Sequence, residues 1–291
     1  MGFHGESIGA YRIERETART RTAATYDVTH ARLGRPVALR VMLAGPGFRG
    51  AQAQFLREAE VLGRLSHPGI ARAYERGTLP DGRAWFVTDR AIGPALADVI
   101  ATGARVDALR VVLELAGILA FAHHAGLAHR NLRADAVRCG ADPRGPALRI
   151  DDWSQSRELA TSPSDATADV HALGVIAFQC LAGVMAFGSG ALALQARTSV
   201  AERFPRAARP LTGLLDRMLS RDVGARPAIG EVCEVAGMIL ERQLRDVAVA
   251  SGEIARATYA HDAPAELAEL SPLDDDSGEM TRVERPRQAA Y

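Results

Sequence analysis

Apolar and polar positions along the first ninety residues follow a pattern that predicts mostly strands. Four short runs have the two-residue period or the β-branched and aromatic content of a strand, and turn-forming residues separate them. Residues 51–65 differ because their apolar side chains fall on one face of a helix. The predicted strands are residues 11–13, 37–41, 70–74 and 84–88.

After residue 96 the pattern becomes helical. Residues 109–124 form a strongly apolar stretch that is typical of a buried helix, and residues 148–150 read as a short strand. No internal repeat interrupts this order. The pattern therefore predicts a strand-rich part with one helix, followed by a mainly helical part. The further predicted helices are residues 170–187, 211–220 and 229–245.

Charge is distributed unevenly. The 291 residues carry 35 basic and 35 acidic side chains, so bulk composition does not favour nucleic-acid binding. From residue 246 onward, ten acidic residues and four arginines give a net charge of −6, which leaves +6 on residues 1–245. We expect residues 246–291 to form an acidic, largely disordered tail. Within it, residues 274–279 are a candidate docking or phosphoacceptor segment.

Several features bear on location. The three cysteines, at positions 139, 180 and 233, have neither zinc-site nor Cys-x-x-Cys spacing, which favours reduced thiols in the cytoplasm. The first residues contain no apolar signal-peptide core. Residues 172–196 carry no charge and exceed the length of about 20 residues that spans a bilayer. Glycines break this segment, so we expect a buried helix and no membrane insertion.

Eight segments, in order, resemble the motifs of a protein kinase domain, in particular that of bacterial serine/threonine kinases. One such motif is a weak signal, whereas eight at compatible spacings are a strong one. The segments are residues 11–16 for the first strand, 33–41 for the turn and third strand, 55–59 for the helix that bears a glutamate, 65–70 for the segment after it, 129–133 for the catalytic loop, 152–154 for the metal-binding Asp-Phe-Gly position, 169–174 for the start of the central helix, and 225–227 for a late structural motif.

The resemblance implies an α+β, two-lobed fold. A small β-rich lobe with one helix would cover residues 11–91, and a larger, mainly helical lobe would cover residues 92–245. Residues 1–10 would be an N-terminal extension, and residues 246–291 the acidic tail. The uncharged residues 172–187 match the buried central helix of the large lobe.

Phosphoryl transfer in this family depends on positioning and on neutralising charge. The glycine positions of the loop that covers the phosphates match Ala18, Thr20 and Ala23, so none of these glycines is kept. Arg40 stands at the phosphate-binding lysine and Glu58 at its partner. All 35 basic residues are arginine, so the change at Arg40 carries little weight, and we expect an Arg–Glu ion pair.

The catalytic loop departs further from the family pattern. Asn131 stands where an aspartate accepts the substrate's proton, and the loss of a general base costs about 10²–10⁴ in rate. Arg133 follows at a lysine-like position. Ala136 replaces the asparagine metal ligand, and a methyl group cannot bind Mg²⁺. Asp152 keeps the other ligand position, either as a metal ligand or in a structural role.

The resemblance also locates the nucleotide. Thr88 matches the position that guards the back of the pocket, and the backbone from Asp89 to Ala91 matches the hinge that binds adenine. Because the phosphate contacts are poor, we expect weak, largely metal-independent nucleotide binding or none. The cofactor expectation is therefore none, or weakly bound ATP with Mg²⁺.

The activation segment is short, with 14 residues between Ser154 and Asp169, and it lacks the Ala-Pro-Glu motif. The glutamate that would pair with Arg226 is therefore absent or replaced, with Glu158 as the candidate. A platform for docking a substrate is hard to build from such a segment.

These departures affect separate parts of one reaction, and they predict a pseudokinase with a regulatory or scaffolding role in signalling. The alternative is a weak or atypical ATP-dependent serine/threonine kinase. A small-molecule phosphotransferase of related fold is a third interpretation. The expected partners are signalling proteins, among them an active kinase, with neither nucleic acid nor a membrane as partner.

Overall fold

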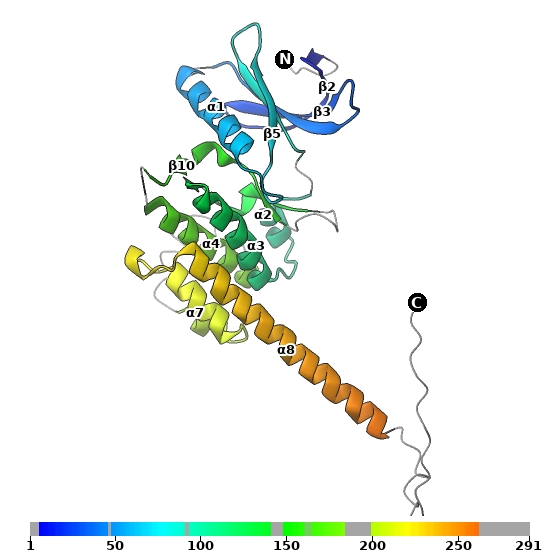
Figure 1. The fold of residues 1–291 in the computed structure, drawn as a ribbon, viewed down its shortest axis with the longest axis vertical. Helices are drawn as coiled ribbons and strands as arrows, with labels where there is room; N and C mark the ends of the chain where they lie inside the picture. Colours follow the sequence, from blue (N-terminus) through cyan, green and yellow to red (C-terminus); the bar gives the residue numbers. More distant parts are fainter. Residues whose placement is uncertain are drawn as a thin grey trace, which may run out of the picture. The chain divides into compact units, whose positions relative to one another are not determined.

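The computed structural model describes residues 6–45, 48–90, 93–140, 148–160, 162, 164–183 and 199–261, with side chains except at residues 48, 49 and 250–261. The chain divides into two units, residues 1–243 and 244–291. The first unit contains a strand-rich lobe and a helical lobe, and all site residues discussed below belong to it (Figure 1).

The strand-rich lobe is built on one antiparallel sheet of six strands in the order β1-β2-β3-β4-β6-β5. Strand β1 lies within the predicted N-terminal extension and pairs with β2. The bounds are β1 (Ser7–Ile8), β2 (Tyr11–Arg19), β3 (Ala23–His30), β4 (Pro36–Met42), β5 (Ala73–Thr78) and β6 (Ala84–Thr88).

The third predicted strand, which corresponds to β5, begins later than its apolar run. Residues 70–74 were expected to be extended, whereas β5 begins at Ala73. Ile70 instead makes an isolated parallel bridge to Ile150 of the helical lobe, and Ile150 donates its N–H to Gly69. The apolar run therefore contributes to the junction between the lobes before it joins the sheet.

Helix α1 (Phe48–Arg64) packs on one face of this sheet (Figure 1). Phe55 of the helix and Phe86 of β6 have ring centroids 4.7 Å apart. Trp85 and Val87, the neighbours of Phe86, point to the opposite face, where they join a second apolar cluster with Leu39. The alternation along β6 thus gives the sheet two apolar faces, one of which positions α1.

The helical lobe is formed around the apolar helices α3 and α4, which pack together. Its short strands form two small antiparallel pairs, β7 with β10 and β8 with β9. The bounds are α2 (Leu96–Ala101), α3 (Ala108–His124), β7 (Leu127–Ala128), η1 (Ala134–Ala136), β8 (Val137–Cys139), β9 (Leu148–Ile150), η2 (Trp153–Gln155), β10 (Arg157–Glu158), α4 (Ser164–Ala182), α6 (Val200–Arg203), α7 (Arg209–Met218), η3 (Val223–Ala225) and α8 (Ile229–His261).

The uncharged segment is explained by the packing of α4. Gly174 lies in the middle of this helix, and a Cβ added there would lie 3.0 Å from Cβ of Met218 in α7. The glycine therefore lets two helices approach closely and does not break α4. Among the helices of the described residues, none has the length and apolar character needed to cross a membrane. Residues 184–198 lie outside the described residues.

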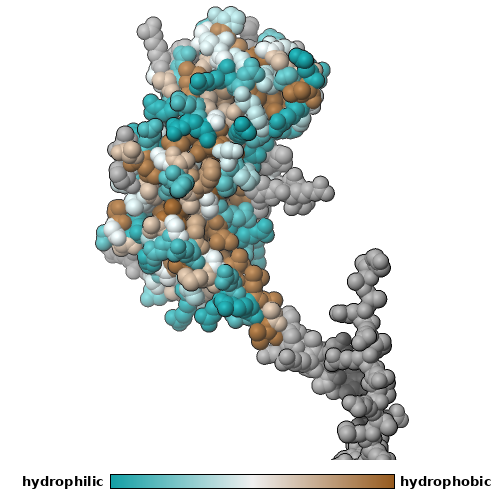
Figure 2. Space-filling view, in the orientation of Figure 1, coloured by the Kyte–Doolittle hydropathy of each residue, from teal (hydrophilic) through white to brown (hydrophobic). Residues whose placement is uncertain are grey.

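Helix α8 extends farther than the pattern predicted. Its expected end was residue 245, whereas the helix continues to His261. Residues 246–261 contain five alanines and no proline, and this composition is compatible with a helix. Figure 2 shows apolar surface along this helix, and Met238, Leu244, Val247 and Val249 are each about 60% exposed. Residues 262–291 lie outside the described residues, so the disorder of the tail stays a prediction.

Candidate functional site

The site lies where the two lobes meet, and two of its residues have unusual backbone conformations. Arg130 has φ of 66° and Asp152 has φ of 57°, and they are the non-glycine residues with positive φ in the described part of the chain. Such backbone costs about 1–3 kcal/mol and persists where the surrounding structure enforces it.

A buried carboxylate enforces the loop conformation. Asp169 of α4, which is fully buried, accepts the backbone N–H of His129 at 2.8 Å and that of Arg130 at 2.7 Å. The ring of His123 contacts the same carboxylate at 2.9 Å. His129 is itself buried, and burial lowers the pKa of its imidazole, with the Asp169 carboxylate opposing the shift. The loop is therefore fixed to the core of the helical lobe.

Asn131 and Arg133, predicted at the catalytic positions, lie side by side. The Arg133 guanidinium donates to Oδ1 of Asn131 at 2.7 Å and to Asp135 at 2.9 and 3.3 Å. The Asn131 amide N–H donates to Asp152 at 3.5 Å. Both polar ends of the Asn131 side chain therefore have partners within the chain, and the amide presents no basic atom.

The two predicted metal-ligand positions also come together here. Ala136 is buried in η1, and its backbone carbonyl accepts the N–H of Asp151 at 2.8 Å. Its methyl group supplies no ligand atom. Asp152 accepts the hydroxyl of Ser154 at 2.6 Å and lies 3.9 Å from Arg133. Among the described residues, no group of three or more His, Cys, Asp and Glu side chains is arranged to hold a metal ion.

The predicted ion pair between the sheet and helix α1 of the strand-rich lobe is present. Arg40 of β4 donates to Glu58 of α1, and the Glu58 side chain is 1% exposed. The Arg40 guanidinium also lies 5.2 Å from the ring centroid of Phe86. Burial raises the pKa of the Glu58 carboxyl, and Arg40 opposes that shift.

A second ion pair in the site was not predicted. Arg138 of β8 donates to the carboxylate of Asp151 at 3.1 Å. Burial raises the pKa of Asp151, and Arg138 opposes this shift. Arg138 makes a backbone bridge to Ala95, just after the hinge, while Asp151 directly precedes Asp152. This pair therefore connects a strand that bridges to Ala95 with the residue that precedes the predicted metal position.

Arg138 could have been noticed in the sequence. It follows Val137 within a short strand of the mainly apolar large lobe, and Asp151 follows the partner strand β9. The sequence does not identify the acidic partner of this arginine, because several carboxylates are equally close to it along the chain.

Asp89, the first residue of the predicted hinge, forms hydrogen bonds to residues near the protein surface. Asp89 accepts the N–H of Arg72 at 3.1 Å, the hydroxyl of Tyr74, and the guanidinium of Arg35 at 3.3 Å. The hydroxyl of Thr88 donates to the carbonyl of Asp89 at 3.1 Å. That carbonyl belongs to the backbone expected to bind adenine, so one of its acceptor positions is already used. Ala91 lies outside the described residues.

The loop at the glycine positions satisfies its own backbone. The Thr20 hydroxyl accepts the N–H groups of Thr22 at 3.3 Å and Ala23 at 3.0 Å. Ala18 remains within β2, paired with Thr25. Arg19 makes two hydrogen bonds to Glu16, at 2.6 and 2.5 Å. The two N–H groups are therefore engaged within the loop, and the Arg19 guanidinium is paired with Glu16 on the surface.

The activation segment corrects one prediction. Glu158 was the candidate partner of Arg226, whereas Arg226 donates to the carbonyls of Ser220 at 2.9 Å and Thr167 at 3.4 Å. Glu158 instead lies 3.9 Å from Arg64 of α1, because β10 pairs with β7 on the α1 side of the helical lobe. Within the described part of the chain, the backbone takes the role expected of a carboxylate.

Comparisons with known proteins agree with this geometry. The chain is 26% identical over 276 residues to the serine/threonine-protein kinase PknJ of Mycobacterium tuberculosis, covering 81% of this chain and 46% of the relative. It is 28% identical over 258 residues to the serine/threonine-protein kinase pkn2 of Myxococcus xanthus, covering 75% and 31%. The chain thus spans less than half the length of these curated relatives. No protein-family model matches it.

A solved structure has the same fold. The apo form of PpkA-294 superposes with a TM-score of 0.68 at 19% sequence identity, covering 80% of this chain and 98% of that one. The strand-rich lobe, the helical lobe and the site between them therefore define a protein-kinase fold. The chain thus has a protein-kinase fold, and its sequence is similar to those of bacterial serine/threonine kinases.

Proposed function

We propose that this domain is a pseudokinase, which keeps the kinase fold without transferring phosphate and acts by binding signalling proteins. The observation that carries the proposal is the pairing of Asn131 with Arg133 at 2.7 Å and with Asp152 at 3.5 Å. An amide with both ends engaged cannot accept the proton of a substrate hydroxyl.

The residues present do not fit a complex of ATP with Mg²⁺. Asp152 remains, but Ala136 offers a methyl group at the second ligand position, and Mg²⁺ requires oxygen ligands. The N–H groups of the Thr20 turn are satisfied internally, and Asp151, which precedes the predicted metal position, is paired with Arg138. We therefore derive no phosphoryl-transfer step for this site and expect no cofactor, or ATP bound weakly.

The framework around the lost groups supports a binding role. Asp169 still holds the loop at His129 and Arg130, and Arg40 still pairs with Glu58. These contacts fix the loop within the helical lobe and α1 on the sheet of the other lobe, which presents a stable surface to partners. Signalling proteins, among them an active kinase, are the partners we propose.

The second candidate is a weak or atypical serine/threonine kinase. The formed Arg40–Glu58 pair and the retained Asp152 favour it, because these groups act on the phosphates and metal in active kinases. This candidate requires Mg²⁺-dependent ATP binding that is lost in Asp152→Ala.

Calorimetric titration with ATP and ADP, with and without Mg²⁺, separates the two candidates. For the pseudokinase we expect weak or undetectable heat that Mg²⁺ does not enhance, equal in the wild-type protein and Asp152→Ala. Tight binding that depends on both Mg²⁺ and Asp152 would favour the kinase. Phosphate transfer that Asn131→Ala abolishes would then overturn the proposal.

A further inference from the structure

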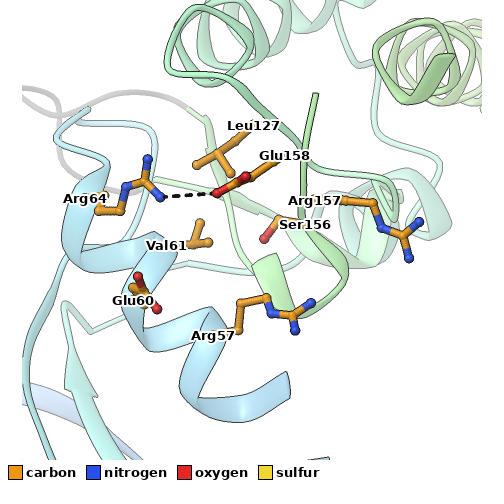
Figure 3. A pocket seen from close by; sticks show the side chains of 8 residues that line it. All are labelled: Arg57, Glu60, Val61, Arg64, Leu127, Ser156, Arg157 and Glu158. Carbon is orange, nitrogen blue, oxygen red and sulfur yellow. Dashed lines mark ion pairs between the residues drawn. The ribbon is translucent and has the colours of Figure 1, made fainter. Parts of the chain in front are cut away.

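A groove on the outer side of α1 is not used by the site between the lobes. A cavity of about 400 Å³ lies between α1 and the segment that includes β7 and β10 (Figure 3). A second cavity of about 240 Å³ lies next to it, and Arg57, Ser156 and Arg157 line both. The two cavities therefore form one groove.

The length of the groove suits an extended peptide. Helix α1 contributes lining residues from Gly50 to Arg64 at the spacing of one helix face. These positions span about 21 Å at 1.5 Å per residue, which matches about six residues of extended chain. A small anion would fill only part of such a groove. Val61 and Leu127 provide an apolar wall along it.

The middle of the groove, where the two cavities meet, contains hydrogen-bond donors that have no acceptor among the described residues. Arg57 and Arg157 have neither a hydrogen bond nor an ion pair in this part of the chain, and Figure 3 shows both guanidiniums on the same side of the pocket. Ser156 also lines both cavities; the residue is 5% exposed, and its buried hydroxyl has no partner among the described residues. A buried hydroxyl without a partner is unfavourable, and the two exposed guanidiniums add positive charge, so this part of the groove favours an anionic acceptor.

The end of the groove at Arg64 is already balanced in charge. Arg64 lies 3.9 Å from Glu158 across the mouth, and Glu60 adds a second carboxylate nearby (Figure 3). An anionic group is therefore favoured at Arg57 and Arg157 and disfavoured beside Glu60. This polarity gives a bound segment one direction.

We propose that this groove binds an acidic peptide segment of a protein partner. Carboxylates would accept from Arg57, Arg157 and Ser156, and an apolar side chain would pack on Val61 and Leu127. The biological role of this groove, as the place where a signalling partner docks, rests on the proposed function. The groove itself lies outside the site between the lobes, so peptide binding does not depend on whether phosphate is transferred.

Fluorescence anisotropy with a labelled acidic heptapeptide, DDELEDD, tests the assignment on the full chain without nucleotide. We expect saturable binding that weakens as salt is added, because the attraction is between partly exposed charges. A basic peptide of equal length, RRQLQRR, should not bind. Absence of binding by the acidic peptide, or equal binding by both, would overturn the proposal.

Variants locate the binding site. Arg57→Gln combined with Arg157→Gln should weaken binding by about tenfold or more, equivalent to about 1.4 kcal/mol. Because both side chains are exposed and unpaired, the melting temperature should not change. Arg76→Gln on β5 is the matched control, since Arg76 is exposed and lies outside the groove. Ser156→Ala should weaken binding without unfolding the protein.

Two results would contradict the assignment. If the doubly substituted protein binds the acidic peptide as tightly as the wild-type protein, the peptide binds elsewhere. If inorganic phosphate displaces the peptide at equal concentration, the groove is a site for a small anion. A failure of the proposed function would be seen in a separate experiment, as phosphate transfer in an assay that contains no peptide.

Discussion

The Arg133 guanidinium donates to Oδ1 of Asn131 at 2.7 Å and lies 3.9 Å from the carboxylate of Asp152. A cation is thus placed between the position of the missing base and that of the retained acid. The same guanidinium is held by Asp135, so its direction is set by the loop itself. The contacts that remain in the loop stabilise its shape and leave the amide of Asn131 fully occupied.

Restoring the base alone should not restore activity. We expect Asn131→Asp to transfer phosphate from labelled ATP to a general protein substrate no faster than Asp152→Ala does. The reason is that Ala136 still lacks a ligand atom and Arg138 still lies toward the hinge. An increase of about 10² or more in Asn131→Asp would contradict this, because it would make the base the sole missing group.

The Arg138–Asp151 pair should contribute to stability as a unit. We expect Arg138→Leu to lower the free energy of unfolding by about 2 kcal/mol, because Asp151 is left partly buried without its charged partner. Asp151→Asn in the same protein should recover most of this loss. Urea unfolding of the wild-type protein, both single variants and the double variant measures the coupling. Additive effects would show that the two side chains do not interact.

The buried imidazole of His129 should make stability depend on pH. Burial holds its pKa below the unfolded value of 6.5, so the unfolded chain binds a proton that the folded chain does not. The stabilisation is therefore present above pH 6.5 and is lost as pH falls below it, by at most about 1.4 kcal/mol per pH unit. His67 and His171 have pKa values lowered by burial and add to this slope.

Urea unfolding between pH 5 and 7 measures that slope in the wild-type protein and in His129→Phe, which should be less sensitive to pH. His124→Phe is the control, since His124 is exposed at the end of α3. If His129→Phe does not fold, NMR titration of the His129 ring in the wild-type protein replaces it. A ring that becomes protonated above pH 6.5 would contradict the prediction.

Two helix glycines should respond oppositely to alanine. A Cβ added at Gly174 of α4 would lie 3.0 Å from Cβ of Met218, whereas a Cβ at Gly117 of α3 would meet nothing within 4 Å. Gly117→Ala should gain about 0.5–1 kcal/mol from helix propensity. Gly174→Ala should instead lose about 1 kcal/mol, because α7 must move away. Thermal unfolding distinguishes the two variants, and a gain at both sites would mean that the α4–α7 contact is looser than described.

The amino-acid sequence by itself determined the order of strands and helices and the α+β, two-lobed fold. It also predicted the ion pair of Arg40 with Glu58, and it assigned Asn131 and Asp152 to one site. These features depend on local periodicity and on motifs at set spacings, which a linear chain already contains. Helix ends were less well predicted, as α8 shows, because an alanine-rich stretch is compatible with both helix and tail.

Only the tertiary structure decided which charged side chains meet. Arginines supply every basic group apart from histidine, and each has many carboxylates to choose from, so sequence spacing cannot select Asp151 for Arg138 or exclude Glu158 for Arg226. The folded backbone makes this choice, because ion pairs and hydrogen bonds form only over a few ångströms. The groove beside α1 depends on the same geometry, since its donors lie a hundred residues apart along the chain and adjacent in space.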